Sequence, residues 1–159
     1  MNIDINISAQ SLTLLDDAGH VAGRYAISTA KNGAGQLQGS LCTPLGDHIV
    51  RAKIGTGAPL NTVFVGRRPT GEIYTPALGA QFPGRDWILT RILWLSGCEV
   101  GHNRLGEVDT MRRYIYIHGS PDSVPMGAPG SIGCIRMRNA DMISLFDQVP
   151  AGTPVKISI

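Results

Sequence analysis

The chain has few charged residues and no long apolar run. Only 16% of its 159 residues are charged and the net charge is +2, so no charge bias points to nucleic acid or a membrane surface as partner. No stretch approaches the ~18 consecutive apolar residues that a membrane-spanning helix needs. These shortages argue against a nucleic-acid-binding protein and against a membrane span.

Cysteine is scarce as well, with three residues at Cys42, Cys98 and Cys134. An odd number cannot form a complete disulfide framework, and free thiols suit a reducing compartment. The amino terminus, MNIDINISAQ, has neither the basic and apolar segments nor the cleavage site of a secretory signal. We therefore expect a cytoplasmic protein, or a periplasmic one if a signal was removed before Met1.

Glycine and proline are frequent by contrast. Twenty glycines and ten prolines against three phenylalanines indicate short strands joined by many turns. The length is that of one domain, so residues 1–159 are predicted to form a single, mainly β domain. Alternating apolar and polar residues predict strands over 2–8, 11–15, 20–28, 46–55, 87–95, 112–119 and 153–159.

One helix is predicted, over residues 139–149. Asn139 is a good N-cap and Asp141 favours the first turn, while Pro150 ends the helix. The apolar residues at helical spacing are Met142, Leu145, Phe146 and Val149.

The chemistry is expected between a strand that ends at His118 and a turn that holds Cys134. If the Gly- and Pro-rich loop between them folds back, the imidazole can act as base for the thiol, and Arg136 adds positive charge. The backbone N–H groups of Ile132, Gly133 and Cys134 can then converge on an oxyanion. From these residues alone a structural histidine and a buried cysteine remain the alternative.

The other cysteines and histidines carry weaker signals. Cys42 is expected to be a small apolar residue. Cys98 and His102 form C-x-x-x-H, but no second pair completes the four ligands of a structural zinc, so neither a metal nor a cofactor is predicted. His20 and His48 are expected to be surface or structural residues.

HGS at 118–120 followed by SIGCIR at 131–136 resembles the signature of the L,D-transpeptidase (YkuD-like) catalytic domain. The segment TPLGDHIVRAKIG and the run WLSGCEVGHNRLGEVDTMRRYIYIHG are similar to that family too, so the resemblance covers roughly residues 40–158. It implies an L,D-transpeptidase-like β-sandwich with one short helix after the catalytic cysteine. It also implies peptidoglycan tetrapeptide stems as substrates, attacked between the diamino acid and the terminal D-Ala.

The resemblance also implies roles for the motif residues. Cys134 is expected to be the nucleophile and His118 its base, oriented by a carbonyl near Gly119 or Ser120. Ser131 is expected to shape the turn.

Two further motif positions concern the substrate. Arg136 is expected to steady the loop or bind a substrate carboxylate. Ile132 stands where the family usually has a histidine. That histidine is not the base, so the dyad is retained, but an aliphatic side chain changes the polarity of the acyl pocket.

The segment before the histidine is polar. Asn103, Asp109 and Arg113 are predicted to position the substrate or support His118, and a turn held by Asx hydrogen bonds is the equal alternative. Tyr116 shares the predicted strand face of His118, so we expect it to line the site.

The expected reaction passes through a thioester on Cys134. Water as acceptor gives an L,D-carboxypeptidase that trims cytoplasmic muropeptides for recycling, which we favour, whereas an amine gives L,D-transpeptidation or D-amino acid exchange in the wall. The alternatives of other classes are a catalytically weak muropeptide-binding or thiol redox sensor, and a cysteine protease, whose papain-like local signature is absent. No oligomeric state is predicted.

Overall fold

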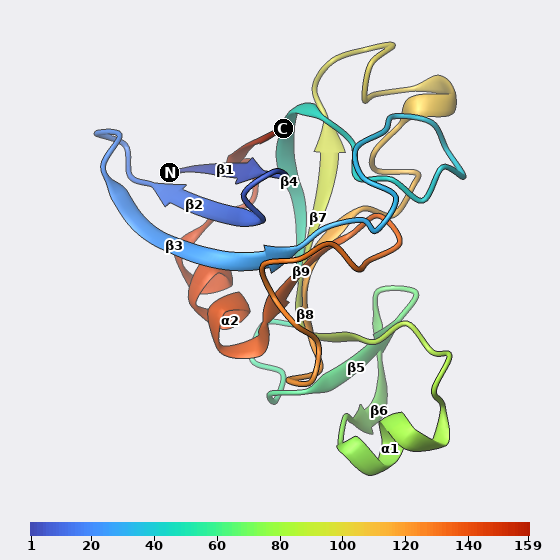
Figure 1. The fold of residues 1–159 in the computed structure, drawn as a ribbon. Coiled ribbons are helices and arrows are strands. Elements are labelled where there is room, and N and C mark those ends of the chain that lie inside the picture. The colour runs from blue at the N-terminus through green and yellow to red at the C-terminus, as the bar shows by residue number, and fades with distance from the viewer.

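The alternating segments fold into strands that pair as one closed sheet (Figure 1). The computed structural model describes residues 1–159. The strands are β1 (Asn2–Asn6), β2 (Ser11–Leu15), β3 (Val21–Ser28), β4 (Gly46–Ile54), β5 (Thr62–Val65), β6 (Arg68–Ile73), β7 (Ile88–Gly97), β8 (Tyr116–Ser120), β9 (Ile135–Arg138) and β10 (Pro154–Ser158). Their order is β4-β10-β1-β2-β3-β9-β8-β7-β5-β6, and β4 also pairs with β7. The mainly β fold is confirmed, and the β4–β7 pairing closes it.

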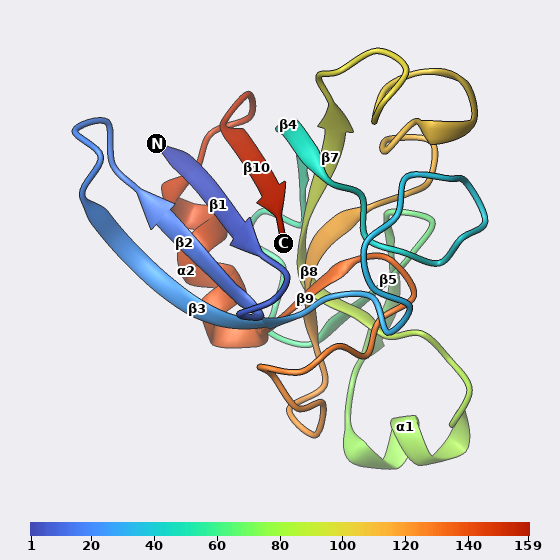
Figure 2. The same cartoon turned by 45° about the horizontal axis from the view of Figure 1, so that its top comes forward.

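Most of the interior is one large apolar cluster, beside two clusters of three residues each. β1 and β2 bury every second residue, with Ile3, Ile5, Leu12 and Leu14 at most 1% exposed. These side chains belong to an 18-residue core that also takes residues from β7, β8 and β9 and from the helix α2. In Figure 2 the strands β1, β2 and β3 pass in front of α2. No helix in the structure is long and apolar enough to cross a membrane.

The helix α2 (Asn139–Gln148) matches the predicted segment, and its apolar face lies in the core as expected. The predicted cap is wrong: Arg138 occupies the N-cap position and Asn139 is the first helical residue. The Asn139 side chain is instead buried, where its Oδ1 accepts from the Thr90 hydroxyl at 2.7 Å and its Nδ2 donates to Asn61 Oδ1 at 2.9 Å. The helix start is therefore tied to β7.

Residues 56–86 hold three elements that alternation did not predict: β5, β6 and the helix α1 (Pro76–Gln81). β5 has only four residues, and β6 contains Pro69 and Gly71, which weaken the strand signal. The helix begins after Thr75, whose hydroxyl accepts from the Leu78 N–H at 3.1 Å. A short 3-10 helix, η1 (Gly106–Val108), lies in the segment before β8.

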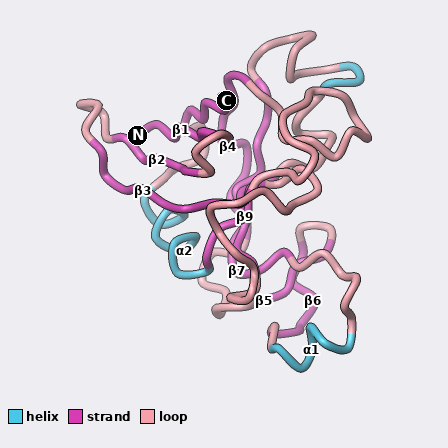
Figure 3. Tube along the Cα trace, in the orientation of Figure 1, coloured by secondary structure: helices cyan, strands magenta, loops and turns pink.

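The long connections lie beside one another. Figure 3 shows loops 29–45 and 98–115 together on one side of the molecule. The Gln38 N–H donates to the Glu107 carbonyl at 2.7 Å, and Arg113 donates to the Gly35 carbonyl at 3.1 Å. These loops therefore form one wall around the start of β8.

His48 in β4 is a buried structural residue, 1% exposed. Its Nδ1 donates to the Gly46 carbonyl at 3.0 Å and its Nε2 accepts from the Thr110 hydroxyl at 2.9 Å. Burial lowers the pKa of His48 to about 4 because no water solvates the imidazolium.

We expect acid to weaken the fold through His48. The unfolded chain protonates this ring near pH 6.5 and the folded chain only near pH 4, so its contribution is complete above pH 6.5 and is lost as the pH falls. The loss should be about 2 kcal/mol at pH 5. Urea unfolding at pH 7 and pH 5 should show a smaller pH effect in His48→Gln than in wild type. The exposed His20 gives the control, His20→Gln. The same pH effect in all three proteins would contradict the assignment.

Candidate active site

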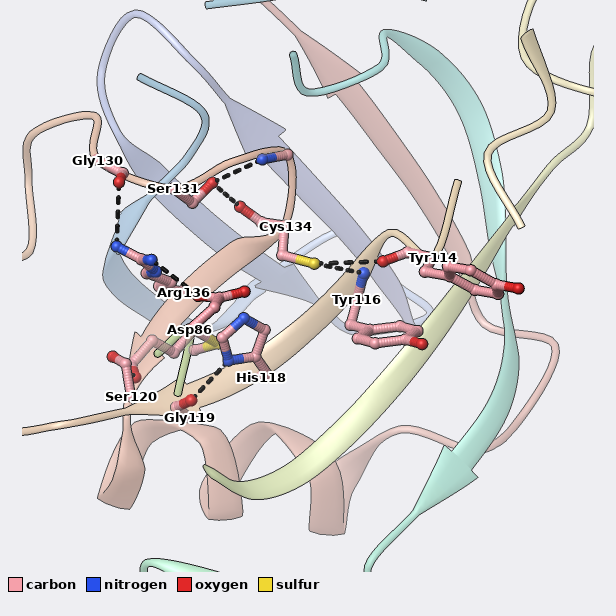
Figure 4. A network of polar contacts seen from close by, with 12 residues as sticks. Asp86, Tyr114, Tyr116, His118, Gly119, Ser120, Gly130, Ser131, Cys134 and Arg136 are labelled. Carbon is pink, nitrogen blue, oxygen red and sulfur yellow. Dashed lines mark hydrogen bonds and ion pairs between the residues drawn. The ribbon is translucent and has the colours of Figure 1, made fainter. Parts of the chain in front are cut away.

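The parallel pairing of β8 and β9 brings the histidine and the cysteine together. His118 pairs with Arg136, and residues 121–134 carry the chain back alongside β8. This register puts Cys134 beside Tyr116. Because residues two apart on a strand share a face, the four side chains lie on one face of the β8–β9 pair (Figure 4).

His118 is fully buried and one of its ring nitrogens has no partner. Nδ1 lies 2.6 Å from the carbonyl oxygen of Gly119; a carbonyl only accepts, so Nδ1 carries the proton. Nε2 is thus left with its lone pair and makes no hydrogen bond in the protein. Burial lowers the pKa of His118, so the ring rests neutral and can act as a base.

Of the two positions expected to orient the ring, Gly119 supplies the carbonyl. A Cβ at Gly119 would lie 2.3 Å from Asn139 Oδ1 and 2.7 Å from the Leu89 carbonyl oxygen, so only glycine fits between β7 and α2. Ser120 has a different contact: its hydroxyl donates to the Met137 carbonyl at 3.0 Å and ties β8 to β9.

The thiol of Cys134 rests on the neighbouring backbone and makes no hydrogen bond to His118. It donates to the Tyr114 carbonyl at 3.3 Å and accepts from the Tyr116 N–H at 3.3 Å. In Figure 4 the imidazole lies on the other side of the sulfur from the Tyr114 carbonyl. Burial raises the pKa of Cys134 to about 12. The resting pair is therefore a neutral thiol and a neutral imidazole.

We expect this protonated thiol to alkylate slowly at neutral pH. With a pKa of about 12, the reaction of Cys134 with iodoacetamide should accelerate about tenfold per pH unit from pH 7 to pH 10, without a plateau. Peptide-resolved mass spectrometry gives the alkylation rate of Cys134. Alkylation of the exposed Cys98 in the same samples shows that the reagent is active. A plateau below pH 8 would instead indicate a resting thiolate.

The turn before Cys134 is built from side-chain hydrogen bonds. The Ser131 hydroxyl donates to the Cys134 carbonyl at 2.5 Å and accepts from the Gly133 N–H at 3.2 Å. Thr43 clamps the turn from outside, donating to the Gly133 carbonyl at 2.9 Å. Gly133 has φ of 138°, a conformation that favours glycine.

These bonds select among the three predicted oxyanion donors. The Gly133 N–H is taken by Ser131, whereas the N–H groups of Ile132 and Cys134 donate to no acceptor in the protein. The latter two are the candidates for holding an oxyanion.

Asp86 is a charged group of the site that the sequence did not reveal. It follows α1 and pairs with Arg136 at 3.1 Å, while Arg136 also donates to the Gly130 carbonyl at 3.1 Å. Beyond the effect of burial, the Asp86 carboxylate raises the pKa of both His118 and Cys134, and Arg136 lowers both. The two charges therefore offset each other beside the dyad, and Arg136 steadies the loop.

Asn103 and Asp109 bind backbone away from the cleft. Asn103 is fully buried, and its amide donates to the carbonyls of Leu45 and Asp47. Asp109 accepts from the Leu105 N–H at 2.6 Å and from the Arg112 N–H at 2.9 Å. This is the alternative of an Asx-held turn, and neither residue lines the space beside Cys134.

Arg113 borders the cleft but holds the facing loop. Its guanidinium donates to four oxygens of that loop, the carbonyls of Gly35, Gln36 and Cys42 and the hydroxyl of Ser40. Its predicted role in substrate binding stays a prediction, because its visible role is to keep loop 35–42 against β8.

A cleft of about 550 Å³ opens at the thiol. The cleft is lined by apolar side chains and a few charged ones. Tyr116, which was expected to line the site, is among them. The lining residues are Leu41, Gly66, Arg67, Asp86, Ile88, Arg113, Tyr114, Ile115, Tyr116, Ile132 and Cys134. Arg67 comes from the β5–β6 turn and was not singled out in the sequence. Nowhere does the structure gather three or more His, Cys, Asp or Glu side chains into a metal site.

Comparison with known proteins agrees with this architecture. A family model described as the L,D-transpeptidase catalytic domain (YkuD) matches residues 2–157, including the amino-terminal strands outside the resembling segment. The probable L,D-transpeptidase ErfK/SrfK of Escherichia coli (strain K12) is 49% identical over 45 residues, which are 28% of this chain and 14% of that protein.

Solved structures show the same fold. The L,D-transpeptidase from Mycobacterium smegmatis has a TM-score of 0.58 at 20% identity, over 99% of this chain and 58% of that one. L,D-transpeptidase 3 from Mycobacterium tuberculosis has a TM-score of 0.61 at 16% identity, over 99% and 59%. This chain thus spans less than two thirds of each of these relatives. Because the family match runs through almost all of it, the chain belongs to the L,D-transpeptidase catalytic domain family.

Proposed function

We propose that this protein is a cysteine-dependent acyl-enzyme peptidase that releases D-Ala from peptidoglycan tetrapeptide stems. The observation that carries the proposal is the unpartnered Nε2 of His118 on the same strand face as the Cys134 thiol, with a cleft opening at the thiol. A buried, neutral imidazole and a protonated thiol on one strand face supply the general base and the nucleophile that acyl transfer needs.

The first half-reaction begins with rotation of the thiol from the Tyr114 carbonyl toward His118. Nε2 takes the thiol proton as the sulfur attacks the carbonyl of the diamino acid, and the N–H groups of Ile132 and Cys134 bind the oxyanion. The C–N bond then breaks, Nε2–H protonates the leaving D-Ala amine, and a thioester remains on Cys134. The Tyr116 N–H bond to sulfur stabilises negative charge there.

In the second half-reaction we propose water as the acceptor. His118 Nε2 takes a proton from water as the water oxygen attacks the thioester carbonyl. The C–S bond then breaks, Nε2–H returns the proton to the Cys134 sulfur, and the tripeptide leaves with a new carboxyl group. The side chains of Ile132 and Leu41, 56% and 49% exposed, border the cleft and offer no polar atom to an amine acceptor. The three free cysteines suit a reducing compartment, so we propose free muropeptides of the cytoplasm as substrates.

Mass spectrometry of a meso-diaminopimelate tetrapeptide incubated with the protein tests the proposal. The tetrapeptide alone, with a D-amino acid, and with a second stem peptide should each give mainly tripeptide. Exchanged or cross-linked peptide as the main product would replace hydrolysis by transpeptidation. An all-L tetrapeptide is the control and should remain intact; its cleavage would indicate an ordinary cysteine protease.

Covalent trapping gives an independent test of the acyl-enzyme step. L,D-transpeptidase 3 from Mycobacterium tuberculosis was solved with a faropenem-derived adduct. If this chain shares that reactivity, intact-mass analysis should show one faropenem-derived adduct per chain. Digestion should place it on Cys134, whereas an adduct on Cys42 or Cys98 alone would contradict the mechanism.

A further inference from the structure

Arg67 sits at the tip of the β5–β6 hairpin in a backbone conformation that arginine seldom adopts. Gly66 and Arg67 have φ of 57° and 64°, and Val65 pairs with Arg68 across this two-residue turn. Such turns require positive φ at both central positions, and glycine is the usual second residue. A left-handed arginine costs about 1 kcal/mol. The cost is understandable if the side chain has a use, because strained residues often serve function.

The side chain of Arg67 reaches from the hairpin to the start of β8. Its guanidinium lies 4.5 Å from the centre of the Trp94 ring and 5.0 Å from that of Tyr114, and it donates to the Tyr116 hydroxyl at 3.0 Å. Trp94 is itself fixed, because its indole N–H donates to the Met111 carbonyl at 3.1 Å. Two aromatic faces and one hydroxyl therefore hold the charged group in place.

Arg67 is also connected to the nucleophile through one residue. The hydroxyl of Tyr116 accepts from Arg67, and the backbone N–H of Tyr116 donates to the Cys134 sulfur. Figure 4 shows the Tyr116 ring leading away from that sulfur. The guanidinium thus lies in the cleft about one tyrosine side chain from the thiol.

Among the arginines of the site, Arg67 alone makes neither an ion pair nor a hydrogen bond to the backbone. The guanidinium of Arg113 is committed to loop oxygens, and Arg136 pairs with Asp86. Arg67 has no acidic partner, and only one of its five N–H groups has an acceptor in the protein. Rings satisfy the charge of a guanidinium but leave its in-plane N–H groups unused. A carboxylate is the group that fits them.

We propose that Arg67 binds a carboxylate of the substrate in the cleft and thereby selects acidic stem peptides. The inference rests on the proposed function, which supplies two carboxylates close to the attacked carbonyl: that of the terminal D-Ala and that on the side chain of diaminopimelate. Either one can meet the fork of Arg67, so the test treats them separately.

The test compares three tetrapeptides: the meso-diaminopimelate peptide, its D-Ala carboxamide and its side-chain carboxamide. Arg67→Gln should lower kcat/KM for the unmodified peptide by about 10- to 100-fold, the range for a charge-assisted hydrogen bond. For wild type, kcat/KM should fall by the same factor on the carboxamide that lacks the carboxylate bound by Arg67. On that carboxamide, Arg67→Gln should show no further fall relative to its kcat/KM on the unmodified peptide. Arg68→Gln changes the neighbouring exposed arginine of the hairpin and should match wild type.

Binding supplies a second measurement that does not need turnover. In a Cys134→Ala background, calorimetry should show the same order of affinities, with Arg67→Gln weakening only peptides that keep the bound carboxylate. If Arg67→Gln weakened the affinity for all three peptides equally, or if Arg68→Gln weakened it as much, Arg67 would have a packing role. Either result would overturn this inference but not the proposed function. Turnover and binding that fail for every peptide, with wild-type residues in place, would overturn the proposed function as well.

Discussion

Cys134→Ala is expected to abolish both the faropenem adduct and the release of D-Ala. The substitution removes the sulfur on which the proposed thioester forms, so the rate should fall by at least about 10⁴-fold. The fold should survive, because the thiol contributes two hydrogen bonds at 3.3 Å and borders the cleft. Intact-mass analysis and tripeptide yield measure the loss, and thermal unfolding checks the fold.

The matched control for this variant is Cys98→Ala. Cys98 is an exposed cysteine in the segment after β7 and does not line the cleft. Its replacement should leave the rate within about twofold, as is usual for a surface change. Residual hydrolysis in Cys134→Ala equal to that of wild type would exclude the thioester mechanism.

Comparing wild type with Cys134→Ala also separates an enzyme from the muropeptide or redox sensor considered in the sequence analysis. A muropeptide sensor would bind the tetrapeptide equally in wild type and in Cys134→Ala, and neither would release D-Ala. A redox sensor would need an accessible thiolate, whereas the thiol of Cys134 rests protonated and bonded to the Tyr114 carbonyl. The geometry therefore favours acyl transfer over redox sensing.

Local patterns predicted β8 and α2 on either side of the dyad, but not β9, the short strand that follows Cys134 and pairs with β8. The apolar run before His118 and the helix after Cys134 indicated where a strand ends and where a helix starts, and both are present as β8 and α2. Ile115 and Ile117 share the core side of the strand, as the alternation predicts. The turn could also be predicted, because Ser131 and Gly133 precede the cysteine in SIGC.

Contacts between distant segments could not be predicted from local patterns. Asp86 meets Arg136 only because β7 and β9 both flank β8. Arg67 reaches Tyr116 across a hairpin whose strands carry Pro69 and Gly71, which hide it from alternation. The resting position of the thiol was equally invisible, since it depends on the Tyr114 carbonyl.

A polar run is also a poor guide to function without its contacts. Asn103, Asp109 and Arg113 stand close together in the sequence before His118, which suggested a substrate-positioning network. Their donors and acceptors are used by backbone groups of the loops 35–47 and 98–113. Loops contain many backbone N–H and C=O groups that are not paired within a helix or sheet. Polar side chains in loops therefore often form hydrogen bonds with these backbone groups.

His118→Gln should lower the rate of thioester formation by about 10²- to 10⁴-fold, the usual contribution of a positioned base. The resting thiol has a pKa of about 12, so almost no thiolate is present near neutral pH without a base. Stopped-flow acylation by faropenem isolates this step from hydrolysis. Thermal unfolding controls for the loss of the buried ring and of its hydrogen bond to Gly119.

The pH profile distinguishes a lost base from a disturbed pocket. Only the neutral ring of His118 can accept the thiol proton, and burial lowers its pKa below the usual 6.5. The acylation rate of wild type should therefore be level from pH 8 to pH 6.5 and decline only at lower pH. In His118→Gln the level region should be absent, because the remaining rate should change about tenfold per pH unit over the whole range with the thiolate fraction.

The two neutral groups also set how the proton moves. A preformed thiolate–imidazolium pair would attack without proton transfer, so its acylation rate would be nearly the same in H₂O and D₂O. In the proposed mechanism Nε2 takes the proton from Cys134 as the sulfur attacks, because the thiol is protonated and the ring is neutral at rest. Wild type should accordingly react measurably more slowly in D₂O. A rate independent of D₂O would mean that the proton has already passed from Cys134 to His118 before the substrate arrives.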